Sequence, residues 1–342
     1  APTSLQALID GARKEGQLNL IWGEGTEGGT PGIQELATGF DKAYGLPTKV
    51  QFTPGDSMPN MGAKLIQEYQ TKRPATSDLY VGYAVHMAAA AQADALESVA
   101  WATWAPNIKD PAMIAGNGLA VGFETSTPGI TYNSQKITGS AIPKTMDDLL
   151  KPEYKGKIAS TPYAANFDLL SMDALWGEQR TVDYLNKFTT QVAGLIRCDE
   201  TSRVESGEFQ LLASDCSQAN TYREKAKGGP VNFVIPSDAP LLLPLYLAVP
   251  KNAAHPDTAK LWINYLMSRE GQDILYKFDQ EDSQLVPGSN TAKQLQGLQT
   301  AGVKFNVVDL SVMQSQDTKE QNRRRAEVQK ILTAKQQPGG KP

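Results

Sequence analysis

A glycine-rich segment is the first part of the chain whose residue types and spacing suggest chemistry. Gly23-Glu24-Gly25-Thr26-Glu27-Gly28 satisfies the pattern G-x-G-x-x-G between an expected strand and an expected helix, as in dinucleotide-binding proteins. Glu24 and Glu27, however, would repel a pyrophosphate, and no acidic residue closes the next expected strand at 49–52. A nucleotide-dependent oxidoreductase that uses this loop is therefore an alternative, beside a mobile loop at a ligand site and a plain connection.

Few other residues could support catalysis or metal binding. The chain contains two histidines, His86 and His255, and two cysteines, so a catalytic triad or a clustered zinc or copper site has little to form from. No nucleophile elbow, phosphate-binding P-loop or metalloprotease helix occurs in the sequence. We therefore expect a binding protein rather than an enzyme, with no cofactor and no bound metal.

Arginines in the second half of the chain suit the capture of a small anion. Arg197, Arg203 and Arg223 fall near the ends of expected strands or helices, and a guanidinium can bind a carboxylate or phosphate through two hydrogen bonds. Arg203 is the first choice, because it follows Thr201 and Ser202 at a helix opening, where backbone N–H groups would act on the same anion. Arg223 is the second choice and Arg197 the third.

Further candidates follow expected strands, where polar side chains could reach a ligand. Trp22 could offer an aromatic wall, although packing the lobe is the alternative role. An ordinary loop or helix-cap role is the alternative for the other residues. The predicted ligand-binding set is Trp22, Glu24, Thr26, Tyr83, His86, Thr161, Tyr163, Asn166, Thr201, Arg203, Tyr222 and Arg223.

Length and charge narrow the class of protein. The chain has 342 residues, 40% of them hydrophobic, so we expect two lobes with a core each. The 33 basic and 37 acidic residues give a formal charge of -4, and no basic stripe could follow a phosphate backbone, so nucleic acid is not an expected partner. We interpret Arg323-Arg324-Arg325 as a solvated helix face. No apolar run is long enough to predict a membrane span.

Strands and helices alternate in both halves of the chain, which predicts the fold class α/β. The alternation predicts parallel strands crossed by helices in the first half. Extended runs at 119–123 and 129–132 are interpreted as the first crossing between lobes. The predicted domains are 1–123 in lobe 1, 124–242 in lobe 2, 243–285 back in lobe 1, and a C-terminal helical segment at 286–342 assigned to neither lobe.

Two helices are predicted in particular detail. A helix near 166–176 follows the expected strand 157–160 in the second half. Another helix begins after Pro256 and carries Ala259, Trp262, Ile263 and Leu266 on one apolar face. We expect the second helix to lie in lobe 1.

The stretch at 247–272 closely resembles a motif of extracellular solute-binding proteins of the iron, polyamine and phosphonate-binding type. The segments 129–133, 143–150 with 154–158, and 206–208 are similar to the same family. The resemblance implies a type II periplasmic binding protein, a clamshell of two α/β lobes joined by two hinge strands, with the ligand in the cleft between them. It also implies a monomeric receptor that delivers a small-molecule ligand to the membrane permease of an ABC importer.

The resemblance also bears on the ligand. Iron-binding members carry adjacent tyrosines in lobe 2, whereas the corresponding stretch here, 219–223, contains Tyr222 followed by Arg223. We therefore expect no iron-type site and favour an organic anion that bears carboxylate or phosphate. A polyamine, attracted by Trp22, Glu24 and Glu27, and a ferric ion are the alternatives.

The resemblance agrees with an exported protein. The chain begins at Ala1 without an initiator Met, as expected once a signal peptide has been removed, although a shortened chain would begin in the same way. We expect the protein in the periplasm. An even number of cysteines in an exported chain predicts a disulfide between Cys198 and Cys216, with two buried thiols as the alternative.

Overall fold

The computed structural model describes residues 4–334, which form two compact units. Among these residues, unit 1 comprises the chain up to Thr125, then Leu243–Thr300 and Val308–Ser315. Unit 2 comprises Ser126–Leu242, Ala301–Val307 and the residues from Gln316 onward. The segment 286–342 was assigned to neither lobe from the sequence, and its described part, up to residue 334, is divided between the two units.

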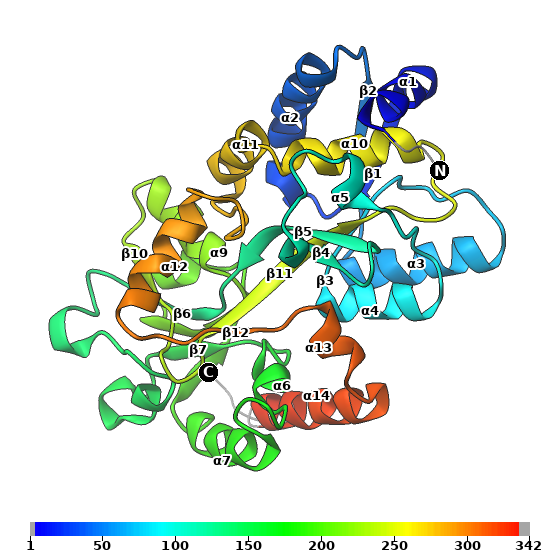
Figure 1. Ribbon diagram of the computed structural model, residues 1–342. Helices are drawn as coiled ribbons and strands as arrows, with labels where there is room; N and C mark the ends of the chain where they lie inside the picture. The colour runs from blue at the N-terminus through cyan, green and yellow to red at the C-terminus, as the bar shows by residue number, and fades with distance from the viewer. Residues whose placement is uncertain (1–3, 335–342) are drawn as a thin grey trace. The chain divides into compact units, whose positions relative to one another are not determined.

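Unit 1 begins with alternating helices and strands (Figure 1). The Ser4 side chain accepts a hydrogen bond from Ala7 N at the start of the first helix, and Gly16 ends it at a φ of 66°. The first two strands pair in parallel, from Gln17 with Lys49 to Trp22 with Pro54. The elements are α1 (Leu5–Glu15), β1 (Gln17–Trp22), η1 (Thr26–Gly28), α2 (Gly29–Tyr44), β2 (Lys49–Pro54), α3 (Met58–Gln70), β3 (Tyr80–Tyr83) and α4 (Ala84–Gln92).

The rest of unit 1 corrects the prediction that its strands are all parallel. β3 pairs antiparallel with β11, and β4 pairs antiparallel with β5. The reason is that β11 returns from a distant part of the chain, which local alternation cannot reveal. The elements are α5 (Trp101–Trp104), β4 (Ile114–Ala115), β5 (Ala120–Ser126), β11 (Leu241–Ala248), α10 (Pro256–Leu266), α11 (Arg269–Asp279), α12 (Asn290–Thr300) and α13 (Leu310–Gln314).

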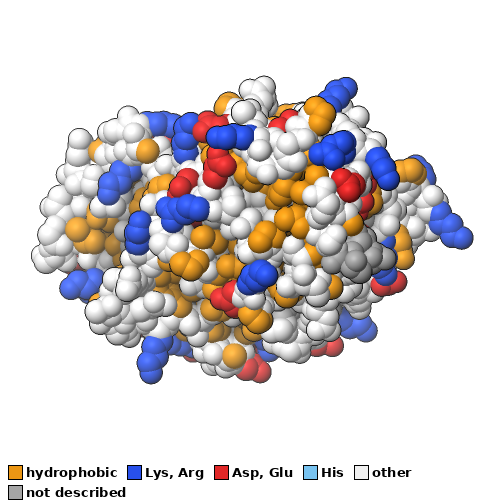
Figure 2. All heavy atoms as spheres, turned by 45° about the horizontal axis from the view of Figure 1, so that its top comes forward, with side chains coloured by type: hydrophobic (Ala, Val, Ile, Leu, Met, Phe, Trp, Pro, Cys, Tyr) orange, Lys and Arg blue, Asp and Glu red, His pale blue; other side chains and the backbone are white. Residues whose placement is uncertain are grey.

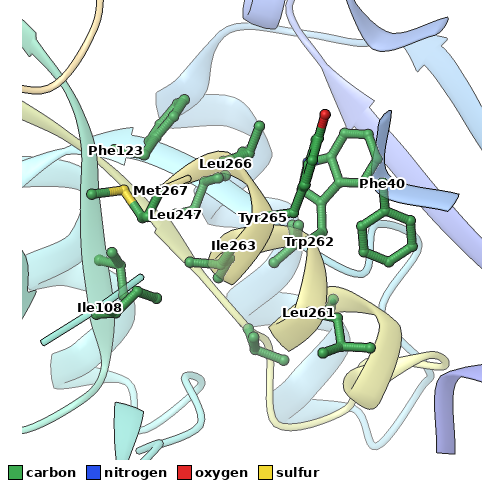
Figure 3. Close-up of a cluster of buried hydrophobic side chains, with 14 of the residues drawn as sticks. Phe40, Ile108, Phe123, Leu247, Leu261, Trp262, Ile263, Tyr265, Leu266 and Met267 are labelled. Atoms are coloured by element: carbon green, nitrogen blue, oxygen red, sulfur yellow. The ribbon is translucent and has the colours of Figure 1, made fainter. Parts of the chain in front are cut away.

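The core of unit 1 is built around α10 (Figure 3). The sequence predicted one apolar face, but every residue from Thr258 to Leu266 is buried, because α1, α2 and α11 all pack against this helix. Phe40 of α2 lies with its ring centroid 5.4 Å from that of Trp262 and 6.0 Å from that of Tyr265. These aromatic contacts hold α10 against α2.

Unit 2 has a five-stranded sheet in the order β10-β6-β9-β7-β8. β7 is parallel to both β8 and β9, whereas β6 is antiparallel to β9 and β10. The strands are β6 (Gly129–Asn133), β7 (Ile158–Ser160), β8 (Val192–Leu195), β9 (Leu211–Asp215) and β10 (Val231–Val234). In addition, β12 (Asn306–Val307) pairs with the first two residues of β11.

The helices of unit 2 differ from the prediction in one place. The helix expected near 166–176 is only the single turn α6 (Phe167–Leu170), because turns such as Gly177 N to Met172 O close the chain. The other helices are α7 (Glu178–Phe188), α8 (Ser202–Glu205), α9 (Gln218–Ala226) and α14 (Thr318–Thr333). The remaining short turns are η2 (Pro111–Met113), η3 (Gly139–Ala141), η4 (Asp147–Leu150) and η5 (Pro152–Tyr154).

The arginine run on α14 is not simply a solvated face, which corrects the prediction. α14 packs along α6 and α7 (Figure 1). Arg323 pairs with Glu178 at 2.7 Å, and Arg324 and Arg325 pair with Asp173 and Asp168 at 3.3 and 2.8 Å. These ion pairs therefore link α14 to the rest of unit 2.

Within residues 4–334, no helix combines the length and the apolar character that crossing a membrane requires. Figure 2 shows acidic and basic side chains interspersed over the visible face of the molecule. This mixture agrees with the formal charge of -4.

Candidate functional site

The parallel strands of unit 2 bring three loops to one edge of its sheet. β7 is parallel to β8 and to β9, so the carboxyl ends of all three strands point the same way. Loops at the carboxyl ends of parallel strands are the usual place for ligand-binding residues in α/β folds. The loops at 161–166, 196–201 and 216–217 therefore form the candidate site.

Covalent and polar links hold these loops together. Cys198 and Cys216 form a disulfide that joins the loop after β8 to the loop after β9. The backbone N–H of Cys198 donates to the Tyr163 hydroxyl at 2.8 Å, and Ser214 Oγ donates to the carbonyl of Ala165. The loop after β7 is thus tied to both of the others.

The backbone of the candidate site is strained. Ala165, Asn166 and Ser214 have positive φ values of 41°, 68° and 55°, although none of them is glycine. Such conformations cost about 1–3 kcal/mol each and cluster at binding and active sites. The surrounding links supply the constraint that holds this conformation, which supports a functional role for this edge of the sheet.

Asp215, at the end of β9, is the buried charge of the site. Its carboxylate accepts hydrogen bonds from Thr131 Oγ1 at 2.5 Å, Asn220 Nδ2 at 3.0 Å and Ser217 N at 3.4 Å. Burial raises the pKa of Asp215 to about 6, and these hydrogen bonds act in the opposite direction. The sequence analysis missed Asp215, although an acid two positions after the apolar run Leu211–Ala213 was a usable signal.

The three arginines are placed differently from the expected ranking. Arg203 makes two hydrogen bonds to Glu208 and also faces Glu200 at 3.7 Å. Arg197 is exposed and makes two hydrogen bonds to Asp199. Arg223 is half-buried on α9 and donates to the neutral side chain of Asn220 at 2.7 Å. Arg223 is therefore the arginine that belongs to the Asp215 network.

Other predicted residues of unit 2 lie at the same edge with mixed exposure. Tyr163 and Asn166 are half-buried, and Tyr222 on α9 packs edge-on against Phe233. Thr161 is fully buried and donates to the carbonyl of Tyr163 at 2.7 Å, which is the ordinary loop role that the sequence left open. Thr201 is also buried.

The hydroxyl Oγ1 of Thr201 is without a hydrogen-bond partner, as is Ser160 Oγ at the end of β7. Unsatisfied buried hydroxyls are uncommon in native structures. Their hydrogen-bonding capacity is available to a ligand group or to water.

The predicted residues of unit 1 have mainly structural roles. Trp22 is 1% exposed and donates from Nε1 to the carbonyl of Leu79 at 3.0 Å, so it packs the core. His86 caps α4, because its Nδ1 accepts from Tyr83 N at 3.2 Å. Glu24 is exposed, and Thr26 is half-buried at the start of η1.

Two glycines at and just after the glycine-rich segment, Gly28 and Gly32, allow close packing of the chain. A Cβ on Gly28 would lie 2.2 Å from Phe278 Cβ, and one on Gly32 would lie 2.0 Å from the carbonyl oxygen of Glu27. Only glycine permits this close approach between the loop and α11. Beside Gly28 and Gly32 the chain itself fills the space, whereas a Cβ on Gly25 would meet nothing within 4 Å.

The same packing buries an unusual carboxyl group. Glu27 is 1% exposed at a φ of 52°, and neither of its carboxylate oxygens has a hydrogen-bond partner. Burial raises the pKa of Glu27, and Asp279 adds to this effect, while Trp262 opposes it. The Trp262 Nε1 does not meet normal hydrogen-bond geometry with Glu27, so both groups remain unsatisfied.

Glu124 is a second carboxyl group of this kind. It lies near the end of β5, is 3% exposed, and its Oε1 has no hydrogen-bond partner. Burial raises its pKa, and Asp279, Glu281, Glu27 and Asp282 raise it further. Among residues 4–334, no group of three or more His, Cys, Asp or Glu side chains is arranged to hold a metal ion.

The sequence matches a family model and two curated relatives. The model of the bacterial extracellular solute-binding protein family matches residues 35–304. An uncharacterised protein of Haemophilus influenzae is 26% identical over 199 residues, which cover 54% of this chain and 55% of that protein. An Fe(3+)-binding periplasmic protein of Serratia marcescens is 23% identical over 183 residues, or 48% of this chain and 52% of that protein. The chain thus matches about half the length of these relatives.

Solved structures extend the likeness to nearly the whole chain. The substrate-binding protein of an ABC transporter from Agrobacterium tumefaciens has a TM-score of 0.74 at 18% identity, covering 94% of this chain and 96% of that one. The periplasmic binding protein AfuA of Actinobacillus pleuropneumoniae, solved with fructose-6-phosphate, has a TM-score of 0.61 at 20% identity, covering 93% and 97%. These likenesses confirm the predicted two-lobed α/β fold class.

The family match decides between the binding protein and the enzyme that the glycine-rich segment left open. A solute-binding family contradicts the oxidoreductase alternative. The family resemblance carried by the stretch at 247–272 is confirmed. The chain therefore belongs to the bacterial extracellular solute-binding proteins.

Proposed function

We propose that the protein is the receptor of an ABC importer, which captures a small organic anion with a carboxylate or phosphate group in the periplasm. As a monomer, it then delivers this ligand to the membrane permease. The observation that carries the proposal is the fixed polar edge of unit 2, where the carboxyl ends of parallel strands present Tyr163, Asn166 and Arg223. Family membership supports the receptor role, and the edge supports the ligand class.

An anion that leaves water needs fixed donors and positive charge to replace its hydration. The edge supplies a phenol at Tyr163, an amide at Asn166 and a guanidinium at Arg223, held by the disulfide and the Asp215 network. Arg223 belongs to the Asp215 network at this edge through its hydrogen bond to Asn220, so we assign the anion to Arg223.

Ferric iron fits these residues less well. The Serratia relative is named as Fe(3+)-binding, but Tyr222 has no adjacent tyrosine in this chain. An iron site built on a pair of phenolates is therefore not available at 219–223. A visible phenolate-to-iron absorption band after ferric loading would overturn this assignment.

A cationic ligand is the second candidate, and one observation favours it. Glu27 and Glu124 of unit 1 are buried carboxyl groups with unsatisfied oxygens, and an ammonium group would satisfy such oxygens. The sequence analysis also gave Trp22 a role in attracting a polyamine. This role loses support, because the indole is buried in the core.

Native mass spectrometry of freshly purified protein tests the proposed ligand class directly. We expect a retained small anion, and calorimetry should show binding of citrate or fructose-6-phosphate. Putrescine and NADH serve as the cationic and dinucleotide comparisons. Binding of putrescine without any binding of anions would replace the anion proposal by the cation account, and turnover with NADH would contradict the receptor proposal.

A further inference from the structure

The carboxylate of Asp215 joins three elements of unit 2. Oδ2 accepts from Thr131 on β6, and Oδ1 accepts from Asn220 on α9 and from the backbone N–H of Ser217. Thr131 Oγ1 also lies 2.7 Å from Thr221 Oγ1 on α9. Asp215 is itself fully buried, so its contacts are with the protein alone.

The charge of Asp215 dictates the orientation of Asn220. An ionised carboxylate can only accept hydrogen bonds, so Asn220 must turn its NH2 group towards Asp215. The amide oxygen of Asn220 then faces Arg223 and accepts from its guanidinium at 2.7 Å. If Asp215 carried a proton or an amide, it could donate, and Asn220 could turn its NH2 group towards Arg223 instead.

We propose that ionised Asp215 is a positioning residue that orients Asn220 and, through it, sets the guanidinium of Arg223 for the ligand anion. This inference rests on the proposed role of Arg223 in ligand binding. Asp215 does not touch the ligand in this account. Protonation of Asp215 releases Asn220 in this account. Ligand binding therefore becomes weaker as the pH falls.

The groups that contact Asp215 through hydrogen bonds are neutral. The hydroxyls of Thr131 and Thr221, the backbone of Ser217 and the amide of Asn220 do not ionise near neutral pH. Tyr163, on the loop after β7, has a pKa raised by burial, with smaller effects of Asp199 and Asp215. Burial raises the pKa of Asp215 to about 6, so the carboxylate is mostly ionised at pH 7.5 and mostly neutral at pH 5.

The test compares Asp215→Asn with a matched control, Asp183→Asn, on the exposed side of α7. Calorimetry with fructose-6-phosphate at pH 7.5 should show about tenfold or greater loss of affinity for Asp215→Asn, as expected for hydrogen bonds to a charged group. The control should bind within about twofold of the parent, as surface substitutions usually do. Equal affinity of Asp215→Asn and the parent at pH 7.5 would overturn the proposal.

The pH dependence is measured as a ratio, because the phosphate monoester itself takes up a proton near pH 6. The dissociation constant of Asp215→Asn divided by that of the parent should fall towards one as the pH is lowered from 7.5 to 5. A ratio that stays constant over this range would contradict a role for ionised Asp215. Asn220→Ala should also weaken binding, and adding Asp215→Asn to it should cost little more.

Hydrogen exchange of the ligand-free protein separates this inference from the proposed function. Amides of residues 217–226 should exchange faster in Asp215→Asn than in Asp183→Asn at pH 7.5. If the parent binds no anion but this difference is present, the proposed ligand class fails and the positioning of α9 stands. If exchange in this segment is unchanged, the positioning role is overturned whatever the protein binds.

Discussion

Asp215 of unit 2 and two buried glutamates of unit 1 have different surroundings, although unit 1 also buries Asp78 with backbone donors. Asp215 of unit 2 accepts hydrogen bonds from two side chains and a backbone N–H, whereas Glu27 and Glu124 of unit 1 have oxygens without a partner. Burial raises the pKa of all three groups. Hydrogen bonds oppose the rise at Asp215, while neighbouring carboxylates add to it at Glu27 and Glu124.

Burial of a carboxyl group therefore has different consequences, depending on the hydrogen-bond donors around it. A buried carboxylate with enough donors can remain an anion at neutral pH and organise its neighbours. A buried carboxyl group without donors favours its protonated form instead. We therefore assign Asp215 to the network that supports the proposed ligand-binding edge, whereas burial favours the protonated forms of Glu27 and Glu124.

Asp215→Ala should have the largest effect on stability. The substitution leaves Thr131 and Asn220 without their acceptor in a buried place, and we expect a loss of about 4 kcal/mol in the free energy of unfolding. Urea denaturation of this variant beside Asp183→Ala measures the effect. A loss no larger than that of the exposed control would show that the network contributes nothing.

The disulfide should have the next largest effect. Cys198 and Cys216 are separated by 18 positions, and a closed loop of this size contributes about 3 kcal/mol. We expect Cys198→Ser with Cys216→Ser to lose this amount in urea denaturation. Thiol titration of the denatured, unreduced parent should find no free thiol. Two free thiols would show that the bond is absent in the protein as purified.

Glu27→Gln should stabilise unit 1 at neutral pH. The pKa of Glu27 is raised in the folded state, so its stabilising contribution is complete below its pKa in the unfolded chain and is lost as the pH rises through its pKa in the folded state. An amide cannot ionise, and we therefore expect Glu27→Gln to be more stable than the parent above neutral pH.

The matched control for this change is Glu24→Gln, three positions earlier on the exposed surface. Thermal unfolding at pH 5 and pH 8 measures both variants. Glu27→Gln should keep more of its stability than the parent as the pH rises, and Glu24→Gln should follow the parent. If Glu27→Gln is less stable than the parent at pH 8, Glu27 is ionised in the folded protein and pairs with a cation or a positively charged group.

The smallest effect is expected at the surface of unit 2. The side chains of Arg323 and Glu178 are 48% and 36% exposed, so solvent screens their pairing. Arg323→Ala should cost about 0.5 kcal/mol in urea denaturation, and the cost should shrink in high salt. A loss of several kcal/mol would mean that α14 is essential for the folding of unit 2.

Local patterns in the sequence predicted most elements, because caps and periodicity are local. Pro256 opens α10 where a helix was predicted, and the stretch at 247–272 identified the family. The antiparallel pairing of β3 with β11 was not predictable from alternation, since it joins segments far apart in the chain. The full burial of α10 was missed because three helices cover it, whereas its own pattern showed one apolar face.

The candidate site stays a prediction, but the places of its residues can be compared. Tyr163 and Asn166 were expected on a loop after a strand and lie after β7, and Arg223, expected near the end of a strand or helix, lies on α9. Arg203 was ranked first because the sequence does not show that Glu208 folds back onto its guanidinium. Asp215 was missed because its role arises from partners on β6 and α9 rather than from its neighbours in sequence.

Calorimetry on three arginine variants tests the central claim most directly. The titrant is the anion that native mass spectrometry finds on the purified protein, and the variants are Arg223→Ala, Arg203→Ala and Arg197→Ala. Loss of a charge-assisted contact to a buried anion typically costs about 2–5 kcal/mol, so Arg223→Ala should bind about 30-fold or more weakly. Arg203→Ala and Arg197→Ala should bind within about threefold of the parent, because their carboxylate partners already occupy them. Parental affinity in Arg223→Ala would contradict the anion site at the edge of unit 2.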